Sequence, residues 1–167
     1  MKEKLHLNVA IITVSDRAAS GTYDDLSGPA AKETLARKFD EGDVKFDLKI
    51  VPDEPLRLHE SIKKFVNDKY DLVITTGGTG IGPRDITPEV TKKLIDKEIP
   101  GIGEAMRSYS MSITKNAMLS RGCAGVAKET LIVNLPGSPK AVSEILDYLS
   151  DTIKHAYYMI RDIDVHS

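Results

Sequence analysis

Cysteine is nearly absent from this sequence, in which Cys123 is the single cysteine among 167 residues. One cysteine cannot form an internal disulfide, and no group of histidines and cysteines at metal-ligand spacing surrounds it. The four histidines also lie outside the motifs described below. The sequence therefore argues against a disulfide-stabilised domain, against a zinc site, and against a mechanism based on a histidine nucleophile or acid–base catalyst.

Long apolar segments and a strong net charge are lacking as well. No stretch approaches the ~20 apolar residues that a membrane-spanning helix needs. The N-terminal residues lead directly into a strand-like run, without the apolar core and cleavage site of a signal peptide. The formal net charge of −2 provides no general field for attracting nucleic acid. We therefore expect a cytoplasmic protein that binds neither membranes nor nucleic acid.

The composition that remains is that of a soluble globular protein, with 41% hydrophobic and 29% charged residues. A chain of 167 residues can build one domain with a substantial core and is too short for two ordinary domains. We expect a single domain over residues 1–167.

Strand-like apolar runs alternate with helical patterns along the whole chain. Strands are predicted at residues 8–14, 46–51, 72–74 and 131–133, and helices at 27–40, around 58–66, from 87, near 104–111, from 138 and at 152–160. This alternation predicts an α/β fold with three layers, in which helices cover both faces of a mostly parallel sheet. The alternating run 46–51 is typical of an edge strand, and the glycine-rich region 99–126 is expected to hold functional loops.

A glycine-rich loop follows the predicted strand 72–74. Its residues are Thr76, Gly77, Gly78, Thr79 and Gly80. Such a turn exposes backbone N–H groups that can bind a phosphate. It matches neither the Walker A loop nor the G-x-G-x-x-G dinucleotide pattern, so from its spacing alone a purely structural turn is an equally good interpretation.

A second turn of the same design follows the strand 131–133. Pro136 and Gly137 precede Ser138, which is followed by a proline at the expected start of a helix. Because the carboxyl ends of parallel strands form the usual binding edge of an α/β sheet, the two turns together could hold two anionic groups. For Ser138 alone, capping of its helix is the favoured interpretation.

Two aspartates are expected at the same edge of the sheet. Asp85 lies between the glycine loop and a helix start at Thr87, which we predict to be an N-cap, and Asp53 follows the strand that ends at residue 51. Ionised carboxylates beside phosphates require a bridging cation, and Mg²⁺ usually binds one or two carboxylates together with phosphate oxygens. For Asp53, the pattern alone favours the alternative that it caps the helix that Pro55 begins.

Cationic residues that could bind further phosphate charge are Arg84, Arg107 and Arg121, although for each one alone a solvated surface arginine is the favoured interpretation. Ser15 and Asp16 close the first strand and open a long loop, which is another candidate wall of the site.

The motifs together resemble those of the molybdenum cofactor biosynthesis proteins of the MogA/MoaB type, whose domain also occurs in gephyrin. The matching segments are residues 15–21, 51–54, 75–80, 84–88, 100–107, 119–121 and 134–139. They follow one another in the order expected for that family and span nearly the whole chain.

The resemblance implies a molybdopterin adenylyltransferase, in which the terminal phosphate of molybdopterin attacks the α-phosphate of Mg-ATP and pyrophosphate leaves. It implies that Asp53 and Asp85 are the catalytic, magnesium-associated carboxylates and that residues 76–80 bind substrate. Further binding residues implied in this way are Glu104, Arg107, Ser120, Arg121, Pro136, Gly137 and Ser138. Family members of this type are homotrimers, or hexamers made of trimers.

Two other functions remain open at this point. A homologue could bind molybdopterin or a nucleotide without transferring AMP, although the presence of both Asp53 and Asp85 favours an enzyme. A nucleotide pyrophosphate hydrolase is the least favoured, because we expect no room for a second catalytic module in 167 residues.

Overall fold

The computed structural model describes residues 5–164. Residues 1–4, part of the stretch considered for a signal peptide, lie outside this range. The strands are β1 (His6–Val14), β2 (Asp43–Val51), β3 (Leu72–Thr76), β4 (Lys97–Glu98), β5 (Ala124–Ala127) and β6 (Thr130–Leu135). They form one sheet in the order β2-β1-β3-β6-β5-β4, in which β2, β1, β3 and β6 are parallel while β5 and β4 are joined by antiparallel pairings. The predicted mostly parallel sheet is confirmed.

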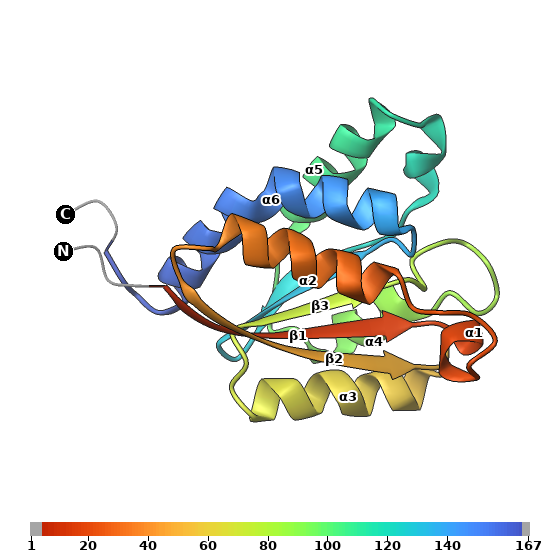
Figure 1. Ribbon diagram of the computed structural model, residues 1–167, viewed down its shortest axis with the longest axis horizontal. Helices are drawn as coiled ribbons and strands as arrows, with labels where there is room; N and C mark the ends of the chain where they lie inside the picture. Colours follow the sequence, from red (N-terminus) through yellow and green to blue (C-terminus); the bar gives the residue numbers. More distant parts are fainter. Residues whose placement is uncertain (1–4, 165–167) are drawn as a thin grey trace.

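Helices cover both faces of this sheet (Figure 1). They are α1 (Asp16–Ala19), α2 (Ser27–Lys38), α3 (Pro55–Asn67), α4 (Thr87–Leu94), α5 (Pro100–Met111), the 3₁₀ helix η1 (Lys115–Leu119) and α6 (Pro139–Ile160). The helices α2, α5 and α6 lie on one face, and α3 and α4 lie on the other. The three-layer arrangement expected from the sequence is therefore confirmed.

The hydrophobic core has two parts, one on each face of the sheet, and the strand β1 contributes to both. Val9 and Ile11 pack into the core beneath α2 and α6, whereas Ala10, Ile12 and Val14 pack into the core above α3 and α4. Successive side chains of a strand point to opposite faces, so a strand buried on both sides is apolar throughout. The strand β2 alternates because it lies at the edge of the sheet, as predicted.

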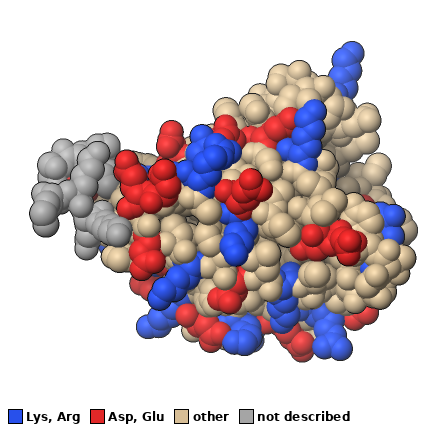
Figure 2. Space-filling view, viewed as in Figure 1, with Lys and Arg blue, Asp and Glu red and all other residues tan. Residues whose placement is uncertain are grey.

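The last helix is longer than its sequence pattern indicated. The predicted segments from 138 and at 152–160 form the single 22-residue helix α6, which keeps an apolar stripe that includes Val142, Leu149 and Ile153. Within residues 5–164, no helix is long and apolar enough to span a membrane. Lysine and arginine side chains are interspersed with acidic ones on the face of the molecule shown in Figure 2, which fits the small net charge.

The predicted start of α2 was wrong in one respect. Ser27 was expected to cap this helix, but it is the first helical residue, and its hydroxyl lies 3.0 Å from that of Thr76. The N-cap residue is Leu26, which makes no side-chain cap, and the Gly28 N–H in the first turn donates instead to the Asp25 carboxylate at 3.0 Å. An aspartate accepts from a first-turn N–H as well as a serine does, so the sequence held two candidate acceptors for this helix start.

Candidate active site

The carboxyl ends of four parallel strands meet at one edge of the sheet. Their last residues are Val14, Val51, Thr76 and Leu135. In the strand register Val14 pairs with Val51, and Thr76 pairs with Leu135 on one side and with Thr13, one residue before Val14, on the other. The two glycine turns also come together there, because the Gly77 N–H donates to the Leu135 carbonyl at 3.0 Å. The convergence expected from the sequence is confirmed.

The glycine loop is folded tightly against its surroundings. Gly77 and Gly78 have φ angles of +91° and +68°, a region that L-residues with a side chain rarely adopt. A Cβ on Gly77 would lie 2.5 Å from the Val14 carbonyl oxygen, and one on Gly78 would lie 2.2 Å from Thr87 Oγ1. The loop thus has a structural reason for its glycines, whether or not a ligand approaches it.

Thr87 has a role other than the predicted one. It was expected to be the N-cap of α4, but it is the first helical residue and makes no side-chain cap. Its hydroxyl donates to the Gly77 carbonyl at 2.9 Å, and its N–H donates to the Gly78 carbonyl at 3.0 Å. The prediction was wrong because the glycine loop, which carries carbonyls that need donors, lies within reach of the threonine.

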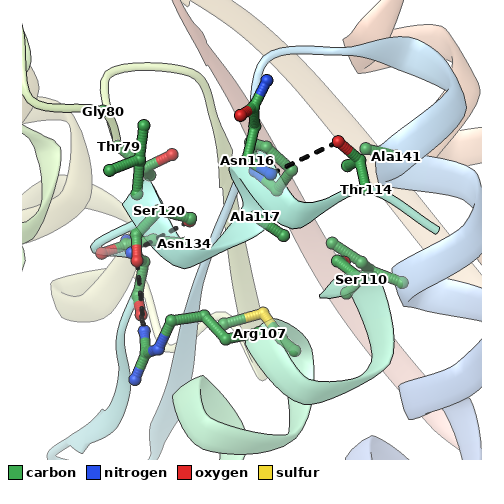
Figure 3. A pocket seen from close by; sticks show the side chains of 15 residues that line it. Thr79, Gly80, Arg107, Ser110, Thr114, Asn116, Ala117, Ser120, Asn134 and Ala141 are labelled. Carbon is green, nitrogen blue, oxygen red and sulfur yellow. Dashed lines mark hydrogen bonds between the residues drawn. The ribbon is translucent and has the colours of Figure 1, made fainter. Parts of the chain in front are cut away.

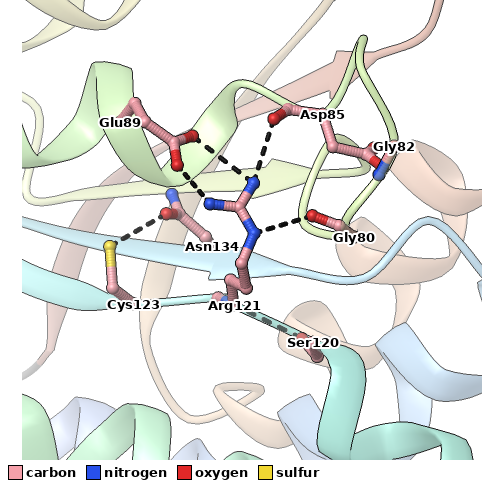
Figure 4. Close-up of polar contacts among 9 residues, drawn as sticks. Gly80, Gly82, Asp85, Glu89, Ser120, Arg121, Cys123 and Asn134 are labelled. Carbon is pink, nitrogen blue, oxygen red and sulfur yellow. Dashed lines mark hydrogen bonds and ion pairs between the residues drawn. The ribbon is translucent and has the colours of Figure 1, made fainter.

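Arg121 holds the far side of the glycine loop (Figure 4). Its Nε donates to the Gly80 carbonyl at 2.8 Å and its Nη2 to the Asp85 carbonyl at 3.0 Å. It also forms an ion pair with Glu89 of α4, and this guanidinium lowers the pKa of the Glu89 carboxyl. The predicted contact of Arg121 with substrate stays a prediction, whereas its contacts with the loop backbone are observed.

Asp53 and Asp16 are joined by a reciprocal pair of hydrogen bonds. The Asp16 N–H donates to Asp53 Oδ2, and the Asp53 N–H donates to Asp16 Oδ1, each at 2.9 Å. The alternative that Asp53 caps α3 is wrong, because the N-cap residue is Glu54 and the Asp53 carboxylate is turned toward the end of β1.

The same pair is extended by Arg84. Its Nε and Nη2 donate to the two carboxylate oxygens of Asp16 at 3.0 and 2.9 Å. The Arg84 guanidinium holds the pKa of the Asp16 carboxyl below its usual value. Burial raises the pKa of the Asp53 carboxyl, and the charges of Asp16 and Asp85 act in the same direction. The two predicted catalytic carboxylates are therefore near enough for the charge of Asp85 to act on Asp53.

Asp85 closes the turn that follows the glycine loop. Its Oδ2 accepts a hydrogen bond from the Gly82 N–H at 2.8 Å and would lie 2.8 Å from a Cβ on Gly80. Within residues 5–164, Oδ1 of Asp85 and Oδ1 of Asp53 accept no hydrogen bond. Each carboxylate thus keeps one oxygen for a cation or a ligand.

A first cavity, of about 310 Å³, lies on the α5 and η1 side of the glycine loop (Figure 3). It is lined by five of the predicted binding residues, Thr79, Gly80, Arg107, Ser120 and Pro136. Arg107 Nη1 donates to the Gly122 carbonyl at 3.0 Å, which fixes the α5 wall to the segment before β5. Most of the region 99–126 is helical rather than loop, and its helices α5 and η1 form the outer wall of the cavity; a function for this region stays a prediction.

A second cavity, of about 230 Å³, lies on the other side of the loop. Four predicted residues line it, namely Ser15, Thr76, Gly77 and Gly137. The N-terminal ends of α2 and α6 contribute Ser27 and Pro139 to the same wall. The glycine loop and the Pro136–Gly137 turn thus separate two cavities at one edge of the sheet.

Three further residues that were predicted to bind substrate, Glu104, Ser138 and Gly78, line neither cavity. Glu104 is exposed and lines neither cavity. Ser138 caps α6, as favoured from the sequence, because its Oγ accepts from the Ala141 N–H at 3.4 Å. Gly78 contacts Thr87 and lines neither cavity. Any contact of these residues with a ligand stays a prediction.

Comparison with known proteins gives the family. A sequence profile described as a probable molybdopterin binding domain matches residues 10–155. The chain belongs to the MogA/MoaB family of molybdenum cofactor biosynthesis proteins. Molybdopterin adenylyltransferase of Helicobacter pylori J99 is 41% identical over 155 residues, covering 92% of this chain and 88% of that protein. The enzyme of the same name from Escherichia coli K12 is 38% identical over 146 residues, covering 87% and 74%.

Solved structures of MogA/MoaB proteins have the same fold. MoaB of Thermus thermophilus superposes with a TM-score of 0.85 at 40% identity, covering 93% of this chain and 97% of that one. A tungsten cofactor synthesizing MoaB from Pyrococcus furiosus gives a TM-score of 0.84 at 34% identity, with coverage of 95% and 99%. The resemblance first found in the motifs thus extends over the whole MogA/MoaB fold.

Two polar residues of this MogA/MoaB domain were given no site role by the sequence analysis, although Asn134 lies in one of its matching segments. Asp25 lines the second cavity and also accepts a hydrogen bond from Thr13 Oγ1 at 2.8 Å. Asn134 is buried in the wall of the first cavity, where its Nδ2 donates to Thr75 Oγ1 and Thr91 Oγ1 at 3.0 and 2.9 Å. An asparagine inside an apolar strand run was the available signal, since a buried amide needs partners.

Proposed function

We propose that this protein is a molybdopterin adenylyltransferase. In the reaction, a terminal phosphate oxygen of molybdopterin forms a bond to the α-phosphorus of ATP. The bond from that phosphorus to the bridging oxygen of the β-phosphate breaks, and pyrophosphate leaves with the electron pair. The reaction joins two phosphate-bearing molecules, so it needs two binding places that meet at one point.

The observation that carries this proposal is the pair of cavities that share the glycine loop as a wall. Asp53, after β2, and Asp85, in the turn after the glycine loop, lie at the same edge of the sheet, and the charge of Asp85 acts on Asp53. Relatives that are about 40% identical over most of the chain bear the name of this activity. A phosphate nucleophile is already ionised at neutral pH, so the absence of a histidine from the motifs is compatible with the chemistry.

The roles of the residues follow from what phosphate transfer requires. Catalysis of such a transfer is mainly positioning and electrostatic stabilisation, because the developing charge is spread over phosphate oxygens. We assign substrate positioning to the loop around Gly77 and Thr79 and to the turn at Gly137. Arg121 and Thr87 keep that loop in one conformation through its carbonyls.

The carboxylates suit a magnesium ion by the chemistry of their donor atoms. Mg²⁺ prefers oxygen ligands and is usually held by one or two carboxylates plus phosphate oxygens and water. Within residues 5–164, no cluster of three or more histidine, cysteine or acidic residues could hold a metal without a ligand. We therefore assign the ion to Asp53 and Asp85 together with the phosphates of ATP. When bound, it would neutralise phosphate charge.

The experiment that tests this proposal mixes the pure protein with molybdopterin and Mg-ATP and measures pyrophosphate and adenylylated pterin. Asp85→Asn should lower kcat on the order of a hundredfold or more, because the charge of the carboxylate is lost while its shape is kept. Asp151→Asn is the matched control, since Asp151 is exposed on α6 and lines neither cavity.

Two outcomes would contradict the proposal. If both ligands bind to the wild-type protein and no product forms, the protein is a binding-only homologue. If Asp85→Asn retains full turnover, the role assigned to Asp85 is wrong. A dependence of the wild-type rate on Mg²⁺ concentration that the Asn variant has lost would support the assigned metal site.

We also propose that the protein works in the cytoplasm as a homotrimer or as a hexamer made of trimers. Exposed apolar side chains near η1 support an assembly, since Met111, Ile113, Met118 and Leu119 are 38–62% exposed. Light scattering coupled to size-exclusion chromatography tests this, and a monomer at micromolar concentration would contradict it.

A further inference from the structure

The second cavity contains one basic side chain. Among the residues that line it, Arg17 is the single lysine or arginine, and Asp25 is the single acid. The Asp25 carboxylate already accepts hydrogen bonds from Thr13 Oγ1, Gly28 N–H and Ser27 Oγ at 2.8, 3.0 and 3.3 Å. Asp25 is therefore occupied in fixing the start of α2 to the end of β1, and it does not pair with Arg17.

Arg17 differs from the other arginines of the described chain. Arg37, Arg57, Arg84, Arg121 and Arg161 each form an ion pair with a carboxylate, and Arg107 donates to backbone carbonyls. Within residues 5–164, the Arg17 guanidinium has neither kind of partner, and it lies instead over the ring of Tyr23, whose centroid is 5.4 Å away. A cation above an aromatic face keeps all its N–H donors for another acceptor.

The backbone holds Arg17 and Tyr23 in this relation. The Arg17 carbonyl accepts hydrogen bonds from the N–H groups of Thr22 and Tyr23 at 3.0 and 3.2 Å and from Ser20 Oγ at 3.1 Å. The loop after α1 is thereby folded back onto Arg17, and both Arg17 and Tyr23 line the second cavity. A donor that is already held in its binding position before the ligand arrives loses less conformational entropy on binding.

We propose that Arg17, supported by Tyr23, binds a phosphate group of a ligand in the second cavity. The inference rests on the proposed adenylyltransferase function and assigns to it a binding residue outside the glycine loop. The planar guanidinium matches two phosphate oxygens at once. The N-terminal ends of α2 and α6, which line the same cavity, add positive potential where the phosphate would lie.

The phosphate can come from either substrate, and separate binding measurements distinguish the two sources. Isothermal titration calorimetry with Mg-ATP alone and with molybdopterin alone should be carried out on the wild type, Arg17→Ala and Arg37→Ala. Arg37 is the matched control, because it is an exposed arginine of α2 that lines neither cavity. Arg17→Ala should raise Kd for one of the two ligands about ten- to a hundredfold, the range for a charge-assisted hydrogen bond.

A loss confined to Mg-ATP assigns Arg17 to the nucleotide, and a loss confined to molybdopterin assigns it to the terminal phosphate of the pterin. The affected affinity should also depend less on salt concentration in Arg17→Ala than in the wild type, because one ionic contact is missing. A purely structural role would not change the salt dependence. If both Kd values of Arg17→Ala match those of Arg37→Ala within twofold, the inference is wrong.

Substitutions of Tyr23 test the supporting contact. Tyr23→Phe keeps the ring and should bind like the wild type, whereas Tyr23→Leu should raise the same Kd about two- to fivefold, the range for an exposed cation–π contact. Equal binding by both variants would overturn the role of the ring. The turnover assay of the wild type separates failures: without adenylylation the proposed function fails, and with adenylylation but no effect of Arg17→Ala only this inference fails.

Discussion

At the scale of single residues, the site depends on side chains and glycines that act on the backbone of the glycine loop. Thr87 and Arg121 both donate to loop carbonyls, and neither Gly77 nor Gly78 could carry a Cβ without a close contact. The sequence left open whether these glycines bind a ligand or form a structural turn. The structure shows that they have a structural function, and a phosphate site built on the same loop would use a backbone already fixed in place.

Gly78→Ala should destabilise the protein by at least about 2 kcal/mol, because the new Cβ combines a positive φ with a clash. The clash is with Thr87 Oγ1, 2.2 Å from the Cβ position. Urea denaturation measures the change. Gly101→Ala is the control, since a Cβ at this position of α5 meets nothing within 4 Å. The control should leave stability unchanged or raise it by up to about 1 kcal/mol. Equal stability of both variants would contradict the account of the loop.

Arg84 should act on Asp53 through Asp16. Removing the Arg84 guanidinium frees the Asp16 carboxylate to move. Asp16 holds Asp53 in place, because its N–H donates to the Asp53 carboxylate and its Oδ1 accepts from the Asp53 N–H. We expect Arg84→Ala to lower kcat/KM roughly tenfold, which corresponds to a coupling within the range seen for residues in one network. The double variant with Asp16→Asn should be no worse than Asp16→Asn alone. Losses that multiply would instead mean that Arg84 contacts the substrate independently.

At the scale of elements, helix α4 is tied to the glycine loop by an exposed ion pair. The side chains of Glu89 of α4 and Arg121 are 53% and 37% exposed, and the guanidinium also reaches the carbonyls of Gly80 and Asp85. Because water screens such a pair, its own contribution is small, and its main effect is to orient a donor toward the loop. The contacts of Arg121 with Glu89, Gly80 and Asp85 thus hold the loop between the two cavities against α4.

Glu89→Gln should cost about 0.5–1 kcal/mol of stability at pH 7, as expected for an exposed pair. The folded-state pKa of Glu89 is lowered from 4.5, so the stabilisation is present above that value and is lost as the pH falls below it. Chemical denaturation at pH 7 and at pH 4 should therefore give a smaller difference from the wild type at the lower pH. Glu60→Gln, at an exposed position of α3 without an ion pair in residues 5–164, should show no such trend. A pH-independent loss in Glu89→Gln would argue against the ion pair.

At the scale of the whole molecule, the layers could be predicted and the cavities could not. Apolar periodicity is a local signal, and it correctly gave the parallel strands and the helices on both faces. The strands β4 and β5 were missed, because Lys97–Glu98 and Ala124–Ala127 are short and have no apolar alternation. Both cavities are lined by residues from distant parts of the chain, brought together at the sheet edge. Asp25 and Tyr23 therefore had no local pattern that could place them beside Gly137.

At the amino ends of the parallel strands, a buried charged residue, Asp71, joins several elements. Asp71, which precedes β3, is 8% exposed, accepts a hydrogen bond from the Asn8 N–H at 2.6 Å and forms an ion pair with Arg161 after α6. Its backbone also bonds to Asn8 and Leu131. One residue thus joins β1, β3, β6 and the end of α6 at the amino ends of the strands. The proposed active site lies at their carboxyl ends, so stability and function should be separable.

Asp71→Ala should lower the free energy of unfolding by about 3 kcal/mol, because it leaves the half-buried Arg161 without its carboxylate. Below the melting transition, kcat/KM and the Kd for Mg-ATP should stay within twofold of the wild type, because the substitution is at the far edge of the sheet. Asp68→Ala is a useful contrast, since Asp68 forms an exposed ion pair with Lys64. It should cost at most about 1 kcal/mol. A fall in activity of Asp71→Ala with the fold intact by circular dichroism would mean that the two edges of the sheet are coupled.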